Sequence, residues 1–179
     1  MSAIKLTTPL TAEMIAGLKA GDEVLISGKI YTARDAAHKK FGDQPPFDLQ
    51  GQIIYYASPT PTKPGEVIGS IGPTTSSRMD AFAPALLNQG LAGMIGKGRR
   101  SKEVIEAIKK NKAVYFTVPG GAAALYAKQV KSAKIVAYPE LLSEAVYELE
   151  VVDFPATVTI DSTGGNLFEI GRKRYENQD

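Results

Sequence analysis

The chain has 179 residues, 44% of them hydrophobic, and its 21 basic and 19 acidic side chains leave a formal net charge of +2. This length fits one domain over residues 1–179, and the near balance of charge argues against nucleic-acid binding through a broad basic surface. The chain has no cysteine and a single histidine, His38. It therefore lacks the thiolates that hold an iron-sulfur cluster, and no metal site is predicted within it.

Neither a targeting segment nor a membrane span is visible in the sequence. The first ten residues lack the basic segment and apolar run of a secretory signal. No apolar stretch approaches the length of a membrane-spanning helix. We therefore expect a cytoplasmic protein that does not associate with membranes.

Runs of β-branched and aromatic residues alternate with segments of helical composition. Strands are predicted over residues 4–7, at a sheet edge, and over residues 23–32, 52–57, 91–95, 113–118, 134–137, 146–152 and 156–160. Helices are predicted over residues 11–18, 33–41, 79–88, 102–110 and 122–130, with Thr11 and Ser101 as N-caps. Within the strand 23–32, Gly28 predicts a bulge. This alternation predicts an α/β domain with buried parallel strands.

The loop over residues 69–80 carries an unusual density of turn and hydroxyl residues. Gly69, Gly72 and Pro73 allow a sharp turn, and four consecutive hydroxyl residues follow at positions 74–77. These hydroxyls are good helix N-caps, so the next helix is predicted to start among them, beside Arg78. A helix start next to an arginine outlines an anion site. The alternative is an ordinary capped loop with Arg78 in solvent.

Three predicted strands end in a turn that carries a cation. These cations are Arg34, Arg78 and Lys97. Ligands of open α/β sheets bind beyond the carboxyl ends of the strands, so the three cations can face one crevice and suit a small dicarboxylate. The alternative is that each cation forms a surface ion pair with an acid such as Asp35 or Asp80. The whole basic run over residues 97–102 is interpreted as a solvated face.

Two side chains near these cations have a structural and a chemical interpretation. Thr74 is a helix cap by itself, and it becomes a base only where a neighbouring cation lowers its pKa. His38 lies four residues beyond Arg34, so it can pack near that side chain as a structural histidine. The pair Gly120 and Gly121 is interpreted as a tight turn, because no P-loop lysine accompanies it.

Four blocks of the chain together carry a family likeness. They are residues 27–38, which read SGKIYTARDAAH, residues 72–80, residues 94–98, and residues 147–155, which read YELEVVDFP. In this order the chain resembles the β subunit of class I, iron-sulfur fumarate hydratases and the similar β subunit of L-tartrate dehydratase. The likeness spans nearly the whole chain.

The resemblance implies a swivelling β/β/α domain with a mixed sheet and flanking helices, equivalent to the C-terminal domain of single-chain class I fumarases. It also implies a partner, a cysteine-bearing α subunit that holds a four-iron four-sulfur cluster, while this chain binds no cofactor alone. A heterotetramer is the expected assembly, and the isolated chain can form a homodimer. The β domain would close over a small dicarboxylate bound at the cluster.

The resemblance also assigns roles to residues at matching positions. Arg34, Arg78 and Lys97 would bind substrate carboxylates. Thr74 would take a proton from the carbon next to a carboxylate, activated by Arg34, with Asp35 orienting the pair. Two further residues, His38 and Thr75, would support these side chains from behind.

The leading functional hypothesis is the reversible hydration of fumarate to L-malate, with activity only in the presence of the α subunit. The first alternative is the dehydration of tartrate to oxaloacetate, which differs by one substrate hydroxyl. The second alternative is a non-catalytic domain that binds small organic anions.

Overall fold

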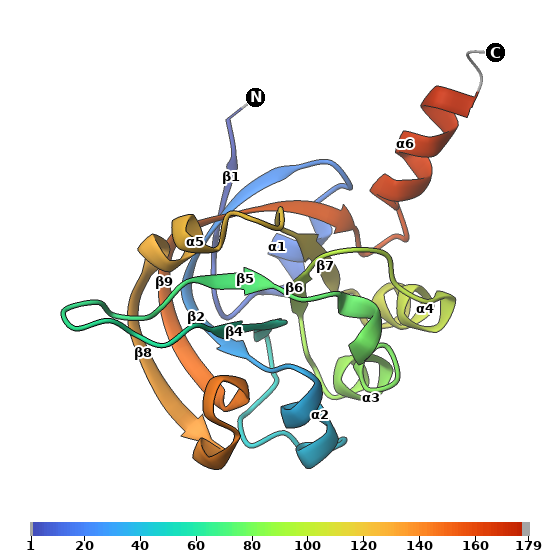
Figure 1. Ribbon diagram of the computed structural model, residues 1–179. Helices are drawn as coiled ribbons and strands as arrows, with labels where there is room; N and C mark the ends of the chain where they lie inside the picture. Colours follow the sequence, from blue (N-terminus) through green and yellow to red (C-terminus); the bar gives the residue numbers. More distant parts are fainter. Residues whose placement is uncertain (1, 177–179) are drawn as a thin grey trace.

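The computed structural model describes residues 2–176, and its elements alternate along the chain as Figure 1 shows. The strands are β1 (Ile4–Thr7), β2 (Glu23–Thr32), β3 (Ile53–Tyr55), β4 (Ala57–Pro59), β5 (Ile71–Pro73), β6 (Gly93–Gly96), β7 (Val114–Thr117), β8 (Val130–Ala137) and β9 (Val146–Ile160). The α-helices are α1 (Ala12–Ala16), α2 (Asp35–Phe41), α3 (Ala83–Asn88), α4 (Lys102–Asn111), α5 (Ala123–Gln129) and α6 (Leu167–Glu176). Two short 3₁₀ turns are η1 (Ser76–Met79) and η2 (Pro139–Glu144).

The main sheet is mixed and closes on itself. Its strand order in the described part of the chain is β1-β2-β3-β6-β7-β9-β8, with β2 also paired to β9. Strands β2, β3, β6 and β7 run parallel, and β9 runs antiparallel to both β7 and β2. The extra pairing joins the ends of this ring, which removes sheet edges from its five strands. The predicted α/β class, with a mixed sheet and flanking helices, is confirmed.

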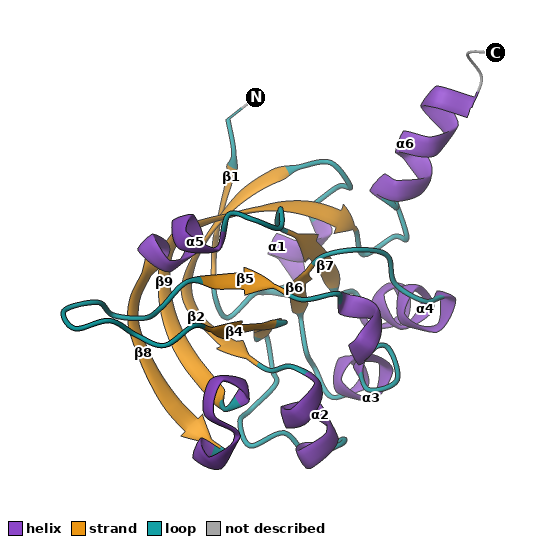
Figure 2. Ribbon diagram, viewed as in Figure 1, coloured by secondary structure: helices purple, strands orange, loops and turns teal. Residues whose placement is uncertain are grey.

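The side chains of each central strand alternate between two hydrophobic cores. In β3, Ile53 and Tyr55 enter one cluster, while Ile54 and the following Tyr56 enter the other. Period-two alternation in a strand that is buried on both faces explains the continuous apolar run in the sequence. The first cluster lies between the strands of the closed sheet, and the second lies beneath α2, α3 and α4, which gather on one side in Figure 2.

The longest strand was predicted in two pieces. The sequence Asp153-Phe154-Pro155 suggested a break, because proline cannot donate to a strand ladder. Instead β9 continues through this point with a bulge, where the register against β2 shifts between Ile26 and Gly28. Asp153 takes a positive φ of 50° there, and its N–H donates to Ser27 Oγ at 3.0 Å. The bulge predicted at Gly28 is thereby confirmed.

Other boundaries differ from the predictions for tertiary reasons. The predicted strand 52–57 splits into β3 and β4, and β4 pairs with β5 in a separate two-stranded sheet. Strand β8 begins at Val130, before the predicted start at residue 134, because it pairs along β9. No helix was predicted in the region of α6. In Figure 1, α6 projects away from the sheet. No helix within the described residues is both long and apolar enough to cross a membrane.

Candidate functional site

The predicted cations gather at the carboxyl ends of the parallel strands. Arg34 follows β2 and occupies the N-cap position of α2, and Lys97 follows β6 directly. Thr74 follows β5, whose partner strand β4 begins two residues after β3. Because β2, β3 and β6 are parallel neighbours, these residues lie at one end of the sheet, where the parallel strands finish. The strand ends that were predicted to surround a crevice therefore lie at the same end of the sheet.

Arg34 is held by contacts to three different segments. Its Nη1 donates to Ser58 Oγ at 2.8 Å, while Nε lies 3.9 Å from Asp35 Oδ2 and 3.8 Å from Glu144 Oε1. The two carboxylates are too far away for hydrogen bonds, so buried Nε and Asp35 Oδ2 have no hydrogen-bond partner. A buried guanidinium nitrogen that makes no hydrogen bond is suited to donate one to an anionic ligand.

Arg78 reaches the same carboxylate from the neighbouring loop. Its Nη1 lies 4.0 Å from Asp35 Oδ2, and 56% of its side chain is exposed. Asp35 therefore lies between two arginines, which brings three predicted site residues together. The ion pairs that the alternative interpretation expected for these arginines are therefore present by distance. Contacts this long and exposed contribute little to stability.

Lys97 lies beside the Thr74 loop. Thr75 forms a parallel β-bridge with Lys97, and Ser76 N donates to the Lys97 carbonyl at 3.0 Å. The Lys97 side chain extends toward Gly120 after β7, where an added Cβ would lie 3.7 Å from Nζ. Among the described residues, no ion pair or hydrogen bond engages this exposed ammonium group. It is thus free to bind a carboxylate.

Thr74 is not a helix cap. Its N–H donates to the Tyr56 carbonyl at 2.7 Å, and its half-buried side chain has no hydrogen-bond partner in the described part of the chain. The cap position of η1 belongs to Thr75, whose side chain makes no capping bond. Within the described part of the chain, no hydrogen bond joins Thr74 to Arg34. They are linked through the β4–β5 pair, in which Ala57, next to Ser58, lies opposite Pro73.

The helix predicted over residues 79–88 is wrong at its start. The hydroxyl run leads into η1, a single 3₁₀ turn of four residues, and α3 begins only at Ala83 with Pro84 in its first turn. A turn this short lacks the aligned peptide dipoles of a helix, so the anion site cannot rest on a helix N-terminus. An anion site here would have to rest on the side chains at the strand ends instead.

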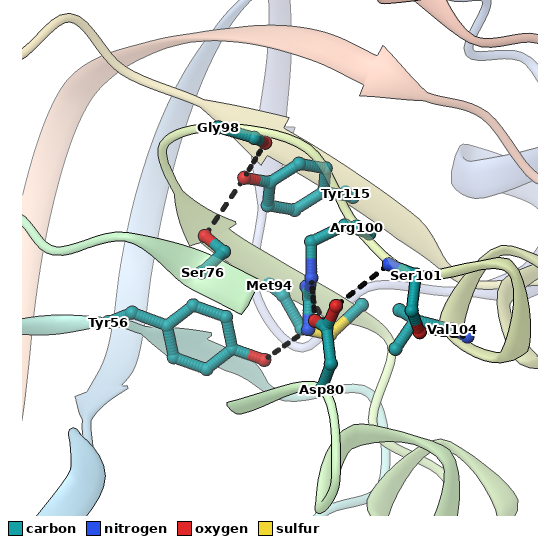
Figure 3. A network of polar contacts seen from close by, with 9 residues as sticks. All are labelled: Tyr56, Ser76, Asp80, Met94, Gly98, Arg100, Ser101, Val104 and Tyr115. Atoms are coloured by element: carbon teal, nitrogen blue, oxygen red, sulfur yellow. Dashed lines mark hydrogen bonds and ion pairs between the residues drawn. The ribbon is translucent and has the colours of Figure 1, made fainter. Parts of the chain in front are cut away.

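Sequence reasoning missed a buried polar network behind the site (Figure 3). The basic run 97–102 was interpreted as solvated, but the Arg100 side chain is fully buried and its Nε donates to Asp80 Oδ1 at 2.6 Å. Tyr115 Oη hydrogen-bonds with Ser76 Oγ and the Gly98 carbonyl at 2.9 and 2.8 Å. Burial raises the pKa of Tyr115 to about 12, so it stays protonated. The only sequence signal was an arginine beside the apolar end of a strand.

His38 supports the backbone at Arg34. The ring Nδ1–H donates to the Arg34 carbonyl at 2.9 Å, and the His38 backbone N–H donates to the same oxygen. The ring is fully buried among Phe41, Tyr56 and Phe82, and Nε2 has no partner. Burial lowers the pKa of His38 to about 4, so the ring is neutral at pH 7.

We expect this burial to make stability depend on pH. The pKa of about 4 in the folded chain lies below the 6.5 of an unfolded histidine, so the unfolded chain binds more protons between these values. The His38 contribution is complete above pH 6.5 and falls as pH drops toward 4, by on the order of 3 kcal/mol. Between pH 7 and pH 5, urea unfolding should show about 2 kcal/mol of this loss, and His38→Gln should reduce it. An equal loss in both proteins would contradict the assignment.

An open groove adjoins Arg34. It has a volume of ≈ 710 Å³ and lies between the β4 segment and the β8–η2 segment. Ser58, which accepts from Arg34, lines one wall, and Leu142, which is 74% exposed, lines the other with Tyr147. Arg34 itself does not line this groove, but its hydrogen-bond partner Ser58 does.

Comparison with known proteins identifies the family of the chain. A family model described as fumarase C-terminus matches residues 1–171. The chain is 41% identical to the putative L(+)-tartrate dehydratase subunit beta of Methanocaldococcus jannaschii, over 93% of this chain and 92% of that protein. It is 35% identical to the L(+)-tartrate dehydratase subunit beta of Escherichia coli, over 95% of this chain and 89% of that protein.

A longer relative aligns with only part of its length. The chain is 40% identical to the putative fumarate hydratase class I of Geobacillus stearothermophilus, over 93% of this chain but 34% of that protein. The resemblance carried by the four sequence blocks is therefore confirmed. With a family model that covers nearly all of its length and relatives of this identity, the chain belongs to the fumarase C-terminus family.

Proposed function

We propose that this chain is the β subunit of a two-subunit hydro-lyase that hydrates fumarate reversibly to L-malate. The observation that carries the proposal is that Arg34, Arg78 and Lys97 lie at one end of the sheet. Beside them, the Thr74 hydroxyl has no hydrogen-bond partner in the described part of the chain. Relatives named fumarate hydratase and tartrate dehydratase support a reaction of this class.

The cations would hold the two carboxylates of the substrate. Arg78 offers a planar fork that can bind one carboxylate through two hydrogen bonds, and Lys97 offers a point charge for the other. Arg34 supplies the buried Nε that lacks a partner. Asp35 and Glu144 lie within 4.0 Å of these arginines and would keep the guanidinium groups in place before substrate arrives.

Thr74 would handle the proton. Loss of water from L-malate breaks a C–H bond beside one carboxylate and the C–O bond at the neighbouring carbon. Thr74 would take the proton from that C–H bond, and the nearby arginines would stabilise its deprotonated oxygen. In the hydration direction Thr74 would return the proton to the same carbon, and the hydroxide of the added water would bond to the neighbouring carbon.

The iron-sulfur cluster implied by the resemblance does not fit this chain's own donors. The sequence has no cysteine, and no group of three or more metal-ligating side chains occurs among the described residues. We therefore place the cluster on a cysteine-bearing α subunit. The part of the reaction that belongs to this chain is binding the carboxylates and moving the proton.

The names of the relatives support a partner subunit. The two relatives that the chain covers almost completely are called β subunits, whereas the chain spans about a third of the fumarate hydratase, at 34%. We propose that the chain corresponds to the C-terminal domain of such longer proteins and assembles with a separate α subunit, with two copies of each chain. The groove beside Ser58 leaves the site open on the side where that subunit would close it.

Tartrate is the second candidate substrate. It is favoured by one specific observation, the 92% and 89% coverage of two tartrate dehydratase β subunits. Tartrate has the same two carboxylates as malate and one more hydroxyl. The three cations would therefore bind either substrate, and the additional hydroxyl must be recognised by other groups.

Assays of the assembled enzyme test the proposal. The chain is co-expressed anaerobically with the cysteine-bearing α subunit of the same genome, the cluster is reconstituted, and turnover is measured on fumarate, mesaconate and L(+)-tartrate. We expect fumarate to be hydrated with the highest kcat/KM. Preference for tartrate would assign the second function. A complex with an intact cluster that turns over none of the three would contradict a hydro-lyase and favour a domain that only binds organic anions.

A further inference from the structure

Arg100 is a buried charge outside the proposed substrate contacts. Its side chain is fully buried, with Nε 2.6 Å from Asp80 Oδ1 and its guanidinium carbon 5.2 and 5.0 Å from the ring centres of Tyr56 and Tyr115 (Figure 3). Its Nη1 lies 3.4 Å from Met94 Sδ, and its Nη2 lies 3.4 Å from Tyr56 Oη. A charge in such a place requires a fixed partner, because leaving it unpaired is costly.

The partner joins two loops that carry site residues. Asp80 lies two residues beyond Arg78, and Arg100 lies three residues beyond Lys97. The second Asp80 oxygen, Oδ2, accepts from the Ser101 N–H at 2.7 Å. One carboxylate thus fixes the Arg78 loop to both the side chain and the backbone of the Lys97 loop.

Two more contacts hold the same loops together. Tyr115 Oη on β7 hydrogen-bonds with Ser76 Oγ in the Arg78 loop and with the Gly98 carbonyl in the Lys97 loop. Gly96, just before Lys97, packs so closely that an added Cβ would lie 1.9 Å from Ser76 Oγ. The loops therefore meet in a close-packed, hydrogen-bonded contact, and the Arg100–Asp80 pair is its charged centre.

We propose that the Arg100–Asp80 pair is a positioning device that sets the spacing between Arg78 and Lys97. This inference rests on the proposed function, in which these two cations hold the carboxylates of one small substrate. The carboxylates of such a substrate lie at a fixed separation, whereas the two cationic side chains are long and exposed. Fixing the backbone beneath them restricts where their charges lie, and errors of about 1 Å in such positioning can reduce rates 100-fold.

The test compares four variants of this chain in the complex with the α subunit. They are Asp80→Asn, Arg100→Met, the double variant, and Asp161→Asn as a matched control. Asp161 is also a buried carboxylate that accepts from backbone N–H groups, those of Ala20, Thr163 and Gly165. It directly follows the end of β9. Because β9 is antiparallel to β7, Asp161 lies at the opposite end of the sheet from Lys97.

Each single variant of the pair should lower kcat/KM for fumarate or tartrate about 100-fold. Because the two residues act as one unit, the double variant should be no worse than Arg100→Met. The double variant should also be more stable than Arg100→Met, since it leaves no unpaired buried charge. That combination separates positioning from stability. Asp161→Asn should lose stability and keep the wild-type kcat/KM.

A second readout does not depend on turnover. In the full chain without its partner, amide hydrogen exchange over residues 74–80 and 97–101 should be faster in Arg100→Met and Asp80→Asn than in wild type, and unchanged in Asp161→Asn. If wild-type complex has no activity while this exchange pattern appears, the proposed function fails and the loop coupling stands. If exchange and kcat/KM in the pair variants match those of Asp161→Asn, the positioning role is overturned.

Discussion

Thr74→Ala is expected to lower kcat for fumarate hydration by about 1000-fold while leaving fumarate binding to the complex nearly unchanged. The substitution removes the hydroxyl proposed to move the proton and leaves the three cations in place. It should cost little stability, because the Thr74 side chain makes no hydrogen bond in the described part of the chain and its backbone bond to Tyr56 remains. Steady-state kinetics and equilibrium binding of fumarate measure the two effects separately.

Two matched variants sharpen this test. Thr74→Ser keeps a hydroxyl and should retain most of the activity, since the two alcohols share the same acid-base chemistry. Ser77→Ala removes an exposed hydroxyl of the same loop and should behave like wild type. If Thr74→Ala weakens fumarate binding and leaves kcat intact, Thr74 is a binding residue and another group moves the proton.

The second large effect is expected for Arg34→Met. Removing this guanidinium should lower kcat/KM by about 1000-fold, because a preorganised charge near the reacting atoms is lost. The effect should appear in both kcat and KM, since Arg34 is assigned both carboxylate binding and the stabilisation of Thr74. Arg34→Lys should restore little, because the three donors of an ammonium share one nitrogen, whereas the planar guanidinium uses Nη1 for Ser58 and has a separate Nε for the substrate.

Arg99→Met provides the control for charge. It removes one cation close to Lys97 in sequence, but the Arg99 side chain lies over the Phe168 ring, 5.4 Å from its centre, on the side of α6. Its kinetics should match wild type apart from a small salt-dependent change in substrate association. Identical kinetics in Arg34→Met and Arg99→Met would remove Arg34 from the site.

The sequence supported the parts of the fold that depend on local pattern. Strand β2 has the predicted bounds, and Thr11 and Ser101 accept from the third residue beyond them as N-caps do. Arg34 and Lys97 were predicted from their positions just after apolar strands, and Arg78 was predicted from the turn and hydroxyl residues that precede it. Parallel neighbours then bring these ends together. The family resemblance supplied the remaining roles, which the residues alone left open.

Long-range pairing explains what local pattern missed. Arg100 and Asp80 are 20 residues apart, and each resembles a solvated charge until its partner is known. Strand β9 crosses Pro155 because β2 pairs with it on both sides of a bulge, which no local rule predicts. The closed sheet depends on this same pairing. The cap interpretation of Thr74 failed because a 3₁₀ turn, with Thr75 at its cap position, replaces the start of the expected helix.

In the proposed function this chain supplies half of an active site. A titration of cluster-loaded α subunit with the purified chain, followed by fumarate hydration at each ratio, tests this division of the site. We predict no turnover by either chain alone and a rate that rises until the chains are present in equal amounts. Turnover by this chain alone, or a rate of the loaded α subunit that does not change when this chain is added, would contradict the claim.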